Sequence, residues 1–154
     1  MVIIRRALEE DKIILANFYR DYWFWNNTKV DHEYMIILDK KKLLGFSEIK
    51  NFNNFIAEII NIYVNEDVRN QGLGDGLLRA SMNYIEKNGS EWVVIQQNEA
   101  LENFLFKKGL QLLKDIKVPP SIREYLKEYN NSTTLLCNIP LFFQKGCKNK
   151  KSMG

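Results

Sequence analysis

The sequence predicts a mixed α/β fold of the α+β type, in which strands and helices are interspersed along 154 residues. Three observations support this prediction. Short apolar runs end at polar turns, apolar residues recur at helical spacing in other segments, and a glycine cluster stands between a strand and a helix. A chain of this length is expected to form one domain with its own core, at residues 1–144.

The first half is expected to contain one helix and a meander of strands. Acidic residues from Glu9 to Asp11 start the helix, where the helix dipole favours negative charge. Apolar side chains at every fourth residue, from Ile14 to Tyr22, extend it to about residue 22. Short polar connections between the later strands favour antiparallel pairing. The expected strands are 2–7, 35–38, 43–50 and 55–64.

The second half is expected to alternate helices with strands. The glycine cluster at 72–76 opens a helix that Asn88 and Gly89 should close with a left-handed cap. A second helix, from about Leu101, should end at Gly109. The buried face of the first helix should consist of Leu77, Leu78, Ser81, Met82 and Ile85. The remaining elements are expected to be strands at 92–97, 110–118 and 133–139, and a helix at 121–129 that starts with a capping box of Ser121 and Glu124.

The positive charge of the chain is concentrated in its last ten residues. The formal net charge is +3, and residues 145–154 hold four lysines and no acidic residue, so subtracting their +4 leaves −1 for residues 1–144. A basic face that could displace counterions from nucleic acid is therefore not expected. Residues 145–154 are predicted to form a basic, disordered tail.

The sequence also argues against membrane insertion and metal binding. No stretch approaches the roughly 18 apolar residues of a membrane span, and no leader pattern starts the chain, so we expect a cytoplasmic protein without a membrane segment. The chain has one histidine, His32, and two cysteines, Cys137 and Cys147. Their spacing fits no metal clip, so no metal site is expected, and His32 is predicted to lie in a loop or at the start of a strand.

The loop after residue 64 has a sequence that suits phosphate binding. N–H groups at a helix start face an anion, and glycine allows close approach and positive φ. The loop lacks the Lys-Ser/Thr of the Walker pattern, and its third glycine comes one residue early for the dinucleotide fingerprint. It does match a pyrophosphate loop of the form Arg/Gln-x-x-Gly-x-Gly/Ala, at Arg69-Asn70-Gln71-Gly72-Leu73-Gly74.

From Val64 to Leu78 the sequence resembles the acetyl-CoA loop and helix of the GNAT superfamily of N-acetyltransferases. The resemblance continues through Ala57 before the loop and through Asn98–Leu110 after it, and it covers residues 2–117. It implies a mostly antiparallel central sheet of about seven strands, flanked by helices, whose fourth and fifth strands splay apart. It also implies that the chain transfers an acetyl group from acetyl-CoA to a primary amine of a small molecule or a peptide.

The same resemblance implies where acetyl-CoA binds. The pantetheine arm would lie between the splayed strands, with a backbone N–H near the thioester carbonyl, and the pyrophosphate would lie on the loop beside the fixed cation of Arg69. The residues that it implies for this site are Ile62, Tyr63, Val64, Arg69, Asn70, Gln71, Gly72, Leu73, Gly74, Asp75, Asn98 and Phe104.

Catalysis requires a group that removes a proton from the attacking amine. The resemblance implies Glu58 as this base, and the alternative is an exposed carboxylate at a strand end. Strand alternation gives Glu58 and Asn61 opposite faces unless the strand contains a bulge. Asn61 is expected either to orient a water molecule or to form a cross-strand hydrogen bond.

Leu105 stands where the family often has a tyrosine that acts as the general acid, and Tyr125 or Tyr129 is a candidate replacement.

Two alternatives to an acetyltransferase remain open at this point. Leu105 favours a regulatory or sensor module that binds CoA without efficient turnover, and a loop that is only a turn would leave an interaction domain. At least two residues of the aromatic run at 22–25 are expected to pack in the core, and a contact of one of them to the acceptor is left open. The sequence decides neither the identity of the acceptor nor whether the chain forms a homodimer.

Overall fold

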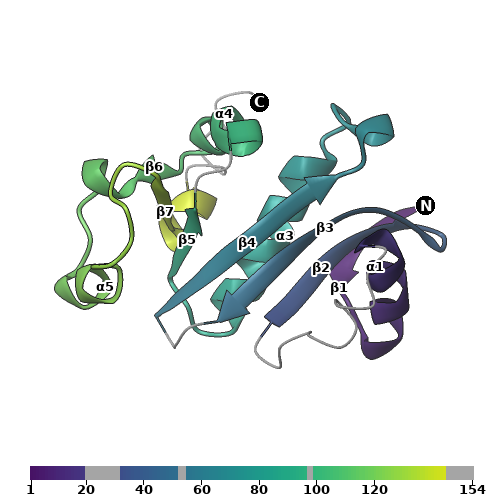
Figure 1. Cartoon of the computed structure of the whole chain (residues 1–154), viewed down its shortest axis with the longest axis horizontal. Helices are drawn as coiled ribbons and strands as arrows, with labels where there is room; N and C mark the ends of the chain where they lie inside the picture. Colours follow the sequence, from purple (N-terminus) through teal and green to yellow (C-terminus); the bar gives the residue numbers. More distant parts are fainter. Residues whose placement is uncertain (20–31, 52–54, 97–98, 145–154) are drawn as a thin grey trace. The chain divides into compact units, whose positions relative to one another are not determined.

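The computed structural model describes residues 1–19, 32–51, 55–96 and 99–144 (Figure 1). The aromatic run at 22–25, Asn98 and the tail at 145–154 lie outside the described residues. The strands are β1 Val2–Arg6, β2 His32–Asp39, β3 Lys42–Asn51, β4 Ile56–Val64, β5 Trp92–Gln96, β6 Gln111–Leu112 and β7 Thr134–Asn138. The helices are α1 Lys12–Tyr19, α3 Leu73–Lys87, α4 Glu99–Lys107 and α5 Pro120–Tyr125, and residues 139–144 are also helical.

The strands form a seven-stranded sheet in the order β1-β2-β3-β4-β5-β7-β6. β4 and β5 pair in parallel, from Ile56 opposite Trp92 to Glu58 opposite Val94. The pairs β1–β2, β2–β3, β5–β7 and β6–β7 are antiparallel. The predicted sheet, mixed and mostly antiparallel with flanking helices, is therefore confirmed.

The chain divides into two compact units, and both β4 and α3 contribute residues to each. The first unit consists of Met1–Asn51 and Ile59–Tyr84. The second unit consists of Phe52–Glu58 and Ile85–Gly154. Each unit has its own apolar cluster, as described below.

In the first unit, α1 and α3 cover opposite faces of the sheet (Figure 1). Phe46 of β3 belongs to the buried cluster that includes Leu15 of α1. The next residue, Ser47, points to the other face because side chains alternate along a strand, and its Oγ lies 2.7 Å from Oγ of Ser81 in α3. The predicted buried face of α3 is confirmed for all five of its residues: Leu77, Leu78, Ser81, Met82 and Ile85.

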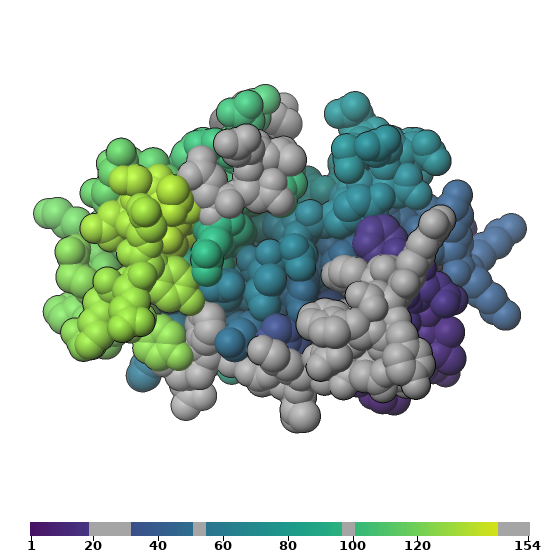
Figure 2. Space-filling view, in the orientation of Figure 1, coloured from purple at the N-terminus to yellow at the C-terminus, as the bar shows by residue number. Residues whose placement is uncertain are grey.

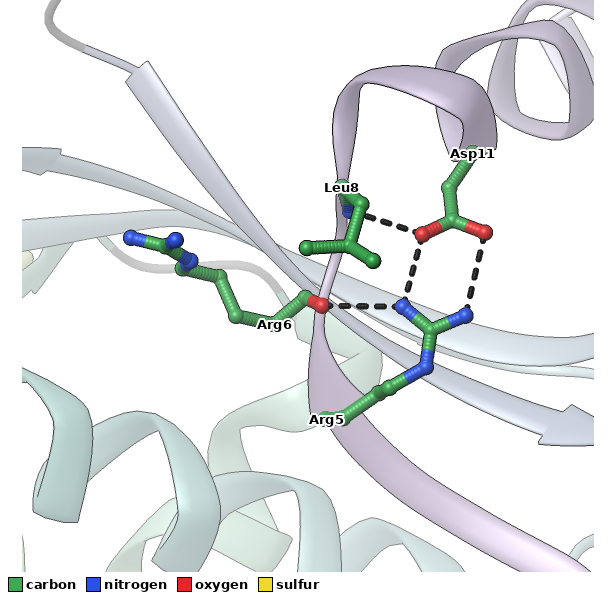
Figure 3. A network of polar contacts seen from close by, with 4 residues as sticks. All are labelled: Arg5, Arg6, Leu8 and Asp11. Atoms are coloured by element: carbon green, nitrogen blue, oxygen red, sulfur yellow. Dashed lines mark hydrogen bonds and ion pairs between the residues drawn. The ribbon is translucent and has the colours of Figure 1, made fainter.

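A network around Asp11 holds the start of α1 against the end of β1 (Figure 3). The guanidinium of Arg5 contacts both carboxylate oxygens, from Nη1 to Oδ2 at 2.6 Å and from Nη2 to Oδ1 at 3.1 Å. The backbone N–H of Leu8 also donates to Oδ2, at 2.7 Å. The hydrogen bond from Arg5 lowers the pKa of Asp11 below its ordinary value, and the N–H of Leu8 adds to this effect.

The second unit has its apolar cluster on one face of β5 and β7. Ile56 and Val94 pack there with Ile122 and Leu126, which lie in and just after α5. α5 itself lies at the surface in Figure 2, and Tyr125 is 40% exposed.

The helices α3 and α4 both end at a glycine with positive φ, Gly89 at 96° and Gly109 at 95°, as predicted for their caps.

Two predicted elements, one strand and one helix, differ most from the structure. The strand expected at 110–118 is only Gln111–Leu112, because a 3-10 turn at Leu113–Asp115 follows it. The capping box of Ser121 and Glu124 is wrong, because α5 starts one residue earlier with Pro120 in its first turn and has no side-chain cap. α5 also ends at Tyr125 instead of residue 129.

The sequence prediction missed the helix at 139–144. Its cap is Asn138, whose Oδ1 accepts a hydrogen bond of 3.1 Å from the N–H of Leu141. The sequence does contain a helix-start pattern here, since Asn before Ile139 and Pro140 is a common helix start.

Among the described residues, no helix is both long enough and apolar enough to cross a membrane.

Candidate active site

The loop between β4 and α3 has the backbone conformation that the glycine pattern predicts. A 3-10 turn at Glu66–Val68 leaves β4, and the side chain of Asn65 caps it. Asn70 and Gly72 then adopt positive φ, at 67° and 80°. A Cβ added at Gly72 would meet no atom within 4 Å, so glycine is needed here for its conformation and not for space.

The start of α3 presents backbone donors next to this loop. The first bond of the helix runs from the N–H of Gly76 to the carbonyl of Gly72, at 3.1 Å. The N–H groups of Leu73 and Gly74 precede this bond and lie in the first turn, where the partial positive charge of the helix dipole is located. Donors at a helix start after a glycine turn can bind a phosphate group.

Arg69 adds a positive charge to the loop in a defined position. Its Nε donates to the carbonyl of Val64, the last residue of β4, at 2.8 Å. Its guanidinium lies 6.0 Å from the centre of the Tyr63 ring. The side chain is still half exposed, so the terminal nitrogens remain available to an anion. Among the described residues, the acidic side chain paired with them is Glu66, at 4.0 Å and itself exposed.

Most of the residues predicted to bind acetyl-CoA form one continuous segment of the first unit. Ile62, Tyr63 and Val64 end β4, the loop follows, and Asp75 lies in the first turn of α3. Ile62 is buried, whereas Asn70, Gln71 and Gly72 are exposed. Phe104 belongs to the second unit, where Nζ of Lys108 lies 5.8 Å from the centre of its ring.

Asn61 forms a hydrogen bond of 2.8 Å from its Nδ2 to Oε1 of Glu48 in β3, so the cross-strand alternative is the one observed. The other oxygen of Glu48, Oε2, lies 2.8 Å from Nδ1 of His32 and 3.0 Å from the hydroxyl of Tyr34. Sequence analysis missed this cluster. His32 lies at the first residue of β2, as predicted, but nothing in the sequence aligned it with Glu48.

In the second unit, Glu58 meets one of the two predicted tyrosines. The hydroxyl of Tyr129 donates to Oε1 of Glu58, at 3.1 Å. The residue Glu58 is only 8% exposed, so the alternative of an exposed carboxylate is wrong. Burial raises the pKa of Tyr129 well above its ordinary value, and the negative charge of Glu58 raises it further. The phenol therefore keeps its proton and remains a donor.

Leu105 lies in α4 and is completely buried. It therefore fills the apolar interior of the second unit and offers no group that could donate a proton. A replacement for the tyrosine acid of the resemblance, if one exists, has to come from another element. Tyr129 is the predicted candidate that contacts the expected base.

Comparisons with known proteins agree with this geometry. The model of the acetyltransferase (GNAT) family matches residues 3–110, which is more than half of the chain. No curated protein matches the chain. GCN5 of Tetrahymena has a similar structure, with a TM-score of 0.71 at 17% identity over 89% of this chain and 96% of that one.

Some of the similar structures were solved with coenzyme A. The N-acetylglutamate synthase of Neisseria gonorrhoeae, in complex with coenzyme A and N-acetyl-glutamate, has a TM-score of 0.67 at 20% identity. That match covers 90% of this chain but only 35% of the synthase. The PaiA N-acetyltransferase of Thermoplasma acidophilum, in complex with coenzyme A, has a TM-score of 0.63 at 16% identity over 90% of this chain and 99% of that one. At these identities the structures show a shared fold, and together with the family match they show that the chain belongs to the GNAT acetyltransferase family.

Proposed function

We propose that this chain transfers an acetyl group from acetyl-CoA to a primary amine of a small molecule or a peptide. The observation that carries the proposal is the segment from Arg69 to Gly74, whose positive φ values and helix start form an anion-binding loop next to a fixed guanidinium. The similar structures that contain coenzyme A support the choice of ligand.

In this proposal, the loop binds the pyrophosphate of the coenzyme. The N–H groups at the start of α3 donate to phosphate oxygens, and Gly72 allows the backbone to approach them because it has no side chain and adopts positive φ. Arg69 contributes charge with little ordering cost, because its Nε is already bonded to Val64. The backbone of Ile62 and Val64 would bind the pantetheine arm along the end of β4.

The reaction itself is the attack of an amine on a thioester, which acetyl-CoA supplies. A C–N bond forms, the C–S bond breaks, the sulfur leaves as a thiolate, and the nitrogen loses a proton. We assign Glu58 as the group that takes this proton, directly or through water. Tyr129 holds the Glu58 carboxylate in one orientation through its hydrogen bond to Oε1.

The buried Leu105 supports a second candidate function. A chain that binds CoA but lacks an acid at this position would act as a regulatory or sensor module. The two candidates differ in turnover, so an amine panel assayed for release of free thiol distinguishes them. The proposed enzyme releases CoA with at least one primary amine, and the module releases none.

Ligand binding is tested by thermal unfolding with acetyl-CoA, CoA, ATP or NADH. A ligand at a hundred times its Kd adds about 2.7 kcal/mol of stability, which raises the midpoint by several degrees for a chain of this size. We expect a shift with both CoA forms and none with NADH. Absence of a shift with either CoA form at millimolar concentration would contradict the proposal.

The variant Gly72→Glu should abolish the shift, because a carboxylate would face the phosphate groups. Gly89→Glu is its matched control. Gly89 also has positive φ and no atom within 4 Å of an added Cβ, so both changes strain the backbone alike. Gly89 caps the opposite end of α3, however, and the CoA shift should persist there.

A further inference from the structure

Four polar side chains gather on one face of the sheet in the first unit, outside the phosphate loop. Glu48 lies at the centre, and His32, Tyr34 and Asn61 each place a polar atom within 3.0 Å of its carboxylate. The side chains of His32 and Glu48 are 11% and 14% exposed. Asn61 is exposed, so the cluster is closed on the side of His32 and open on the side of Asn61.

Strand register explains why these residues meet. In β2 and β3, Tyr34 lies directly opposite Glu48. Between β3 and β4, the N–H of Asn65 donates to the carbonyl of Leu44 at 2.7 Å. Because these two strands run antiparallel, four residues back from Asn65 in β4 lies opposite four residues forward from Leu44 in β3, which places Asn61 beside Glu48. The cluster therefore spans three strands, and its β4 residue, Asn61, directly precedes the end of β4 where the acetyl-CoA arm is proposed to bind.

The hydrogen bonds leave one acceptor position of the Glu48 carboxylate unfilled by the described residues. A carboxylate offers about four lone-pair positions, and the described residues fill two on Oε2 and one on Oε1. The remaining position on Oε1 lies beside the exposed Asn61. If Nδ1 of His32 donates to Glu48, its Nε2 is a bare acceptor, and Nε2 is buried with no partner among the described residues.

We propose that this cluster binds the ammonium group of the amine acceptor, with Glu48 as its counter-ion. A primary ammonium carries several N–H donors, a positive charge and no acceptor, which complements a carboxylate with an unused lone pair. The inference rests on the proposed function, because it places the acceptor next to the backbone of Ile62. His32 and Tyr34 are positioning residues, since they hold Glu48 but face away from its open oxygen.

The single histidine of the chain makes the cluster directly observable. On protein without a histidine tag, every imidazole proton signal in an NMR spectrum comes from His32. The probe is n-butylamine, which is an ammonium ion near neutral pH, and 1-butanol is its uncharged analogue. We expect a saturable shift of the His32 signals with butylamine and none with butanol.

The variants are Glu48→Gln and, as a matched control, Glu33→Gln. Glu33 is the neighbour of His32 in β2, and its side chain points to the opposite face of the sheet. Glu48→Gln keeps the shape but removes the charge, and it should weaken butylamine binding at least about tenfold, as expected for loss of a charged hydrogen bond. Glu33→Gln should leave the binding curve unchanged. Equal curves for wild type and Glu48→Gln, or an equal response to butanol, would overturn the inference.

Kinetics separate this inference from the proposed function. For an amine that turns over, Glu48→Gln should raise KM for the amine at least about tenfold and leave KM for acetyl-CoA unchanged. A purely structural role would instead lower the melting midpoint without changing the KM for the amine. If the chain fails to bind CoA, the proposed function falls, but the NMR titration still decides whether the cluster binds an ammonium group.

Discussion

The hydroxyl of Tyr129 donates a hydrogen bond of 3.1 Å to the carboxylate of Glu58, which stands 71 positions earlier in the chain. The contact fixes the segment that follows α5 to the first residues of strand β4 within the second unit. It also explains why the tyrosine retains its proton, since ionisation would place two negative charges side by side in a poorly solvated place.

This contact predicts how stability depends on alkaline pH. The folded state raises the pKa of Tyr129 above its unfolded value of 10.0, so the folded state holds the proton more tightly. The stabilisation is fully present below about pH 10 and decreases as the pH rises beyond it, because the unfolded chain then ionises first. In urea unfolding, wild type should lose more stability than Tyr129→Phe between neutral pH and pH 11. Equal losses in the two proteins would contradict the assignment.

The ion pair between Arg5 and Asp11 predicts the opposite pH dependence (Figure 3). The folded state lowers the pKa of Asp11 below its unfolded value of 3.8. Its stabilisation is therefore present above that pH and is lost as the pH falls through the lowered pKa of the folded state. Asp11→Asn should cost about 1–2 kcal/mol near neutral pH, because Arg5 and the N–H of Leu8 lose a charged acceptor.

Glu9→Gln is the control for Asp11→Asn. Glu9 also pairs with a cation, Lys12 at 3.1 Å, but its side chain is 84% exposed. An exposed pair contributes little, so this change should alter the free energy of unfolding by less than about 0.5 kcal/mol. Comparable losses for both variants would mean that Asp11 acts only through general surface charge.

The two buried serines of the first unit predict an asymmetric pair of variants. Ser81 Oγ donates to the carbonyl of Leu77 at 2.7 Å, so the proton between the hydroxyls of Ser47 and Ser81 belongs to Ser47. Ser81→Ala would leave a buried donor on Ser47 without its acceptor and should cost about 1–3 kcal/mol. Ser47→Ala leaves the donor of Ser81 satisfied and should cost less. Chemical denaturation of both variants measures the order, and a larger loss for Ser47→Ala would reverse the assigned direction.

Arg69 should affect ligand binding more than folding. Arg69→Gln removes the positive charge next to the loop, and we expect the affinity for CoA to fall about tenfold, as for loss of one charged hydrogen bond. Because the side chain is half exposed, the melting midpoint without ligand should change little. Calorimetric titration with CoA, on protein whose unliganded midpoint matches wild type, measures this effect. Unchanged affinity would separate Arg69 from the anion site.

Local signals in the sequence predicted most of the fold. The buried stripe of α3 and the glycine caps at Gly89 and Gly109 depend on neighbours within one or two turns, so spacing alone revealed them. The strand expected at 110–118 failed because an apolar run does not distinguish a strand from a 3-10 turn.

The candidate site was also predictable only in part, because only its local features follow from the spacing of residues along the chain. The loop from Arg69 to Gly74 is a continuous motif, and its positive φ values follow from its residues. The cluster around Glu48 depends instead on the register of three strands, and the pairing of Glu58 with Tyr129 joins distant segments. Neither register nor long-range pairing is encoded in local spacing.

Gly45 in β3 limits which sequences can adopt this fold. The register of β2 and β3 shifts beside it, and a Cβ at this position would lie 2.5 Å from the backbone oxygen of Tyr63 in β4. Backbone cannot yield as a flexible side chain can, so even alanine would force β4 away from β3. A mutational scan should therefore find that no other amino acid is tolerated at position 45. The strand that is proposed to receive the coenzyme thus depends on a residue that has no side chain and no reactive group.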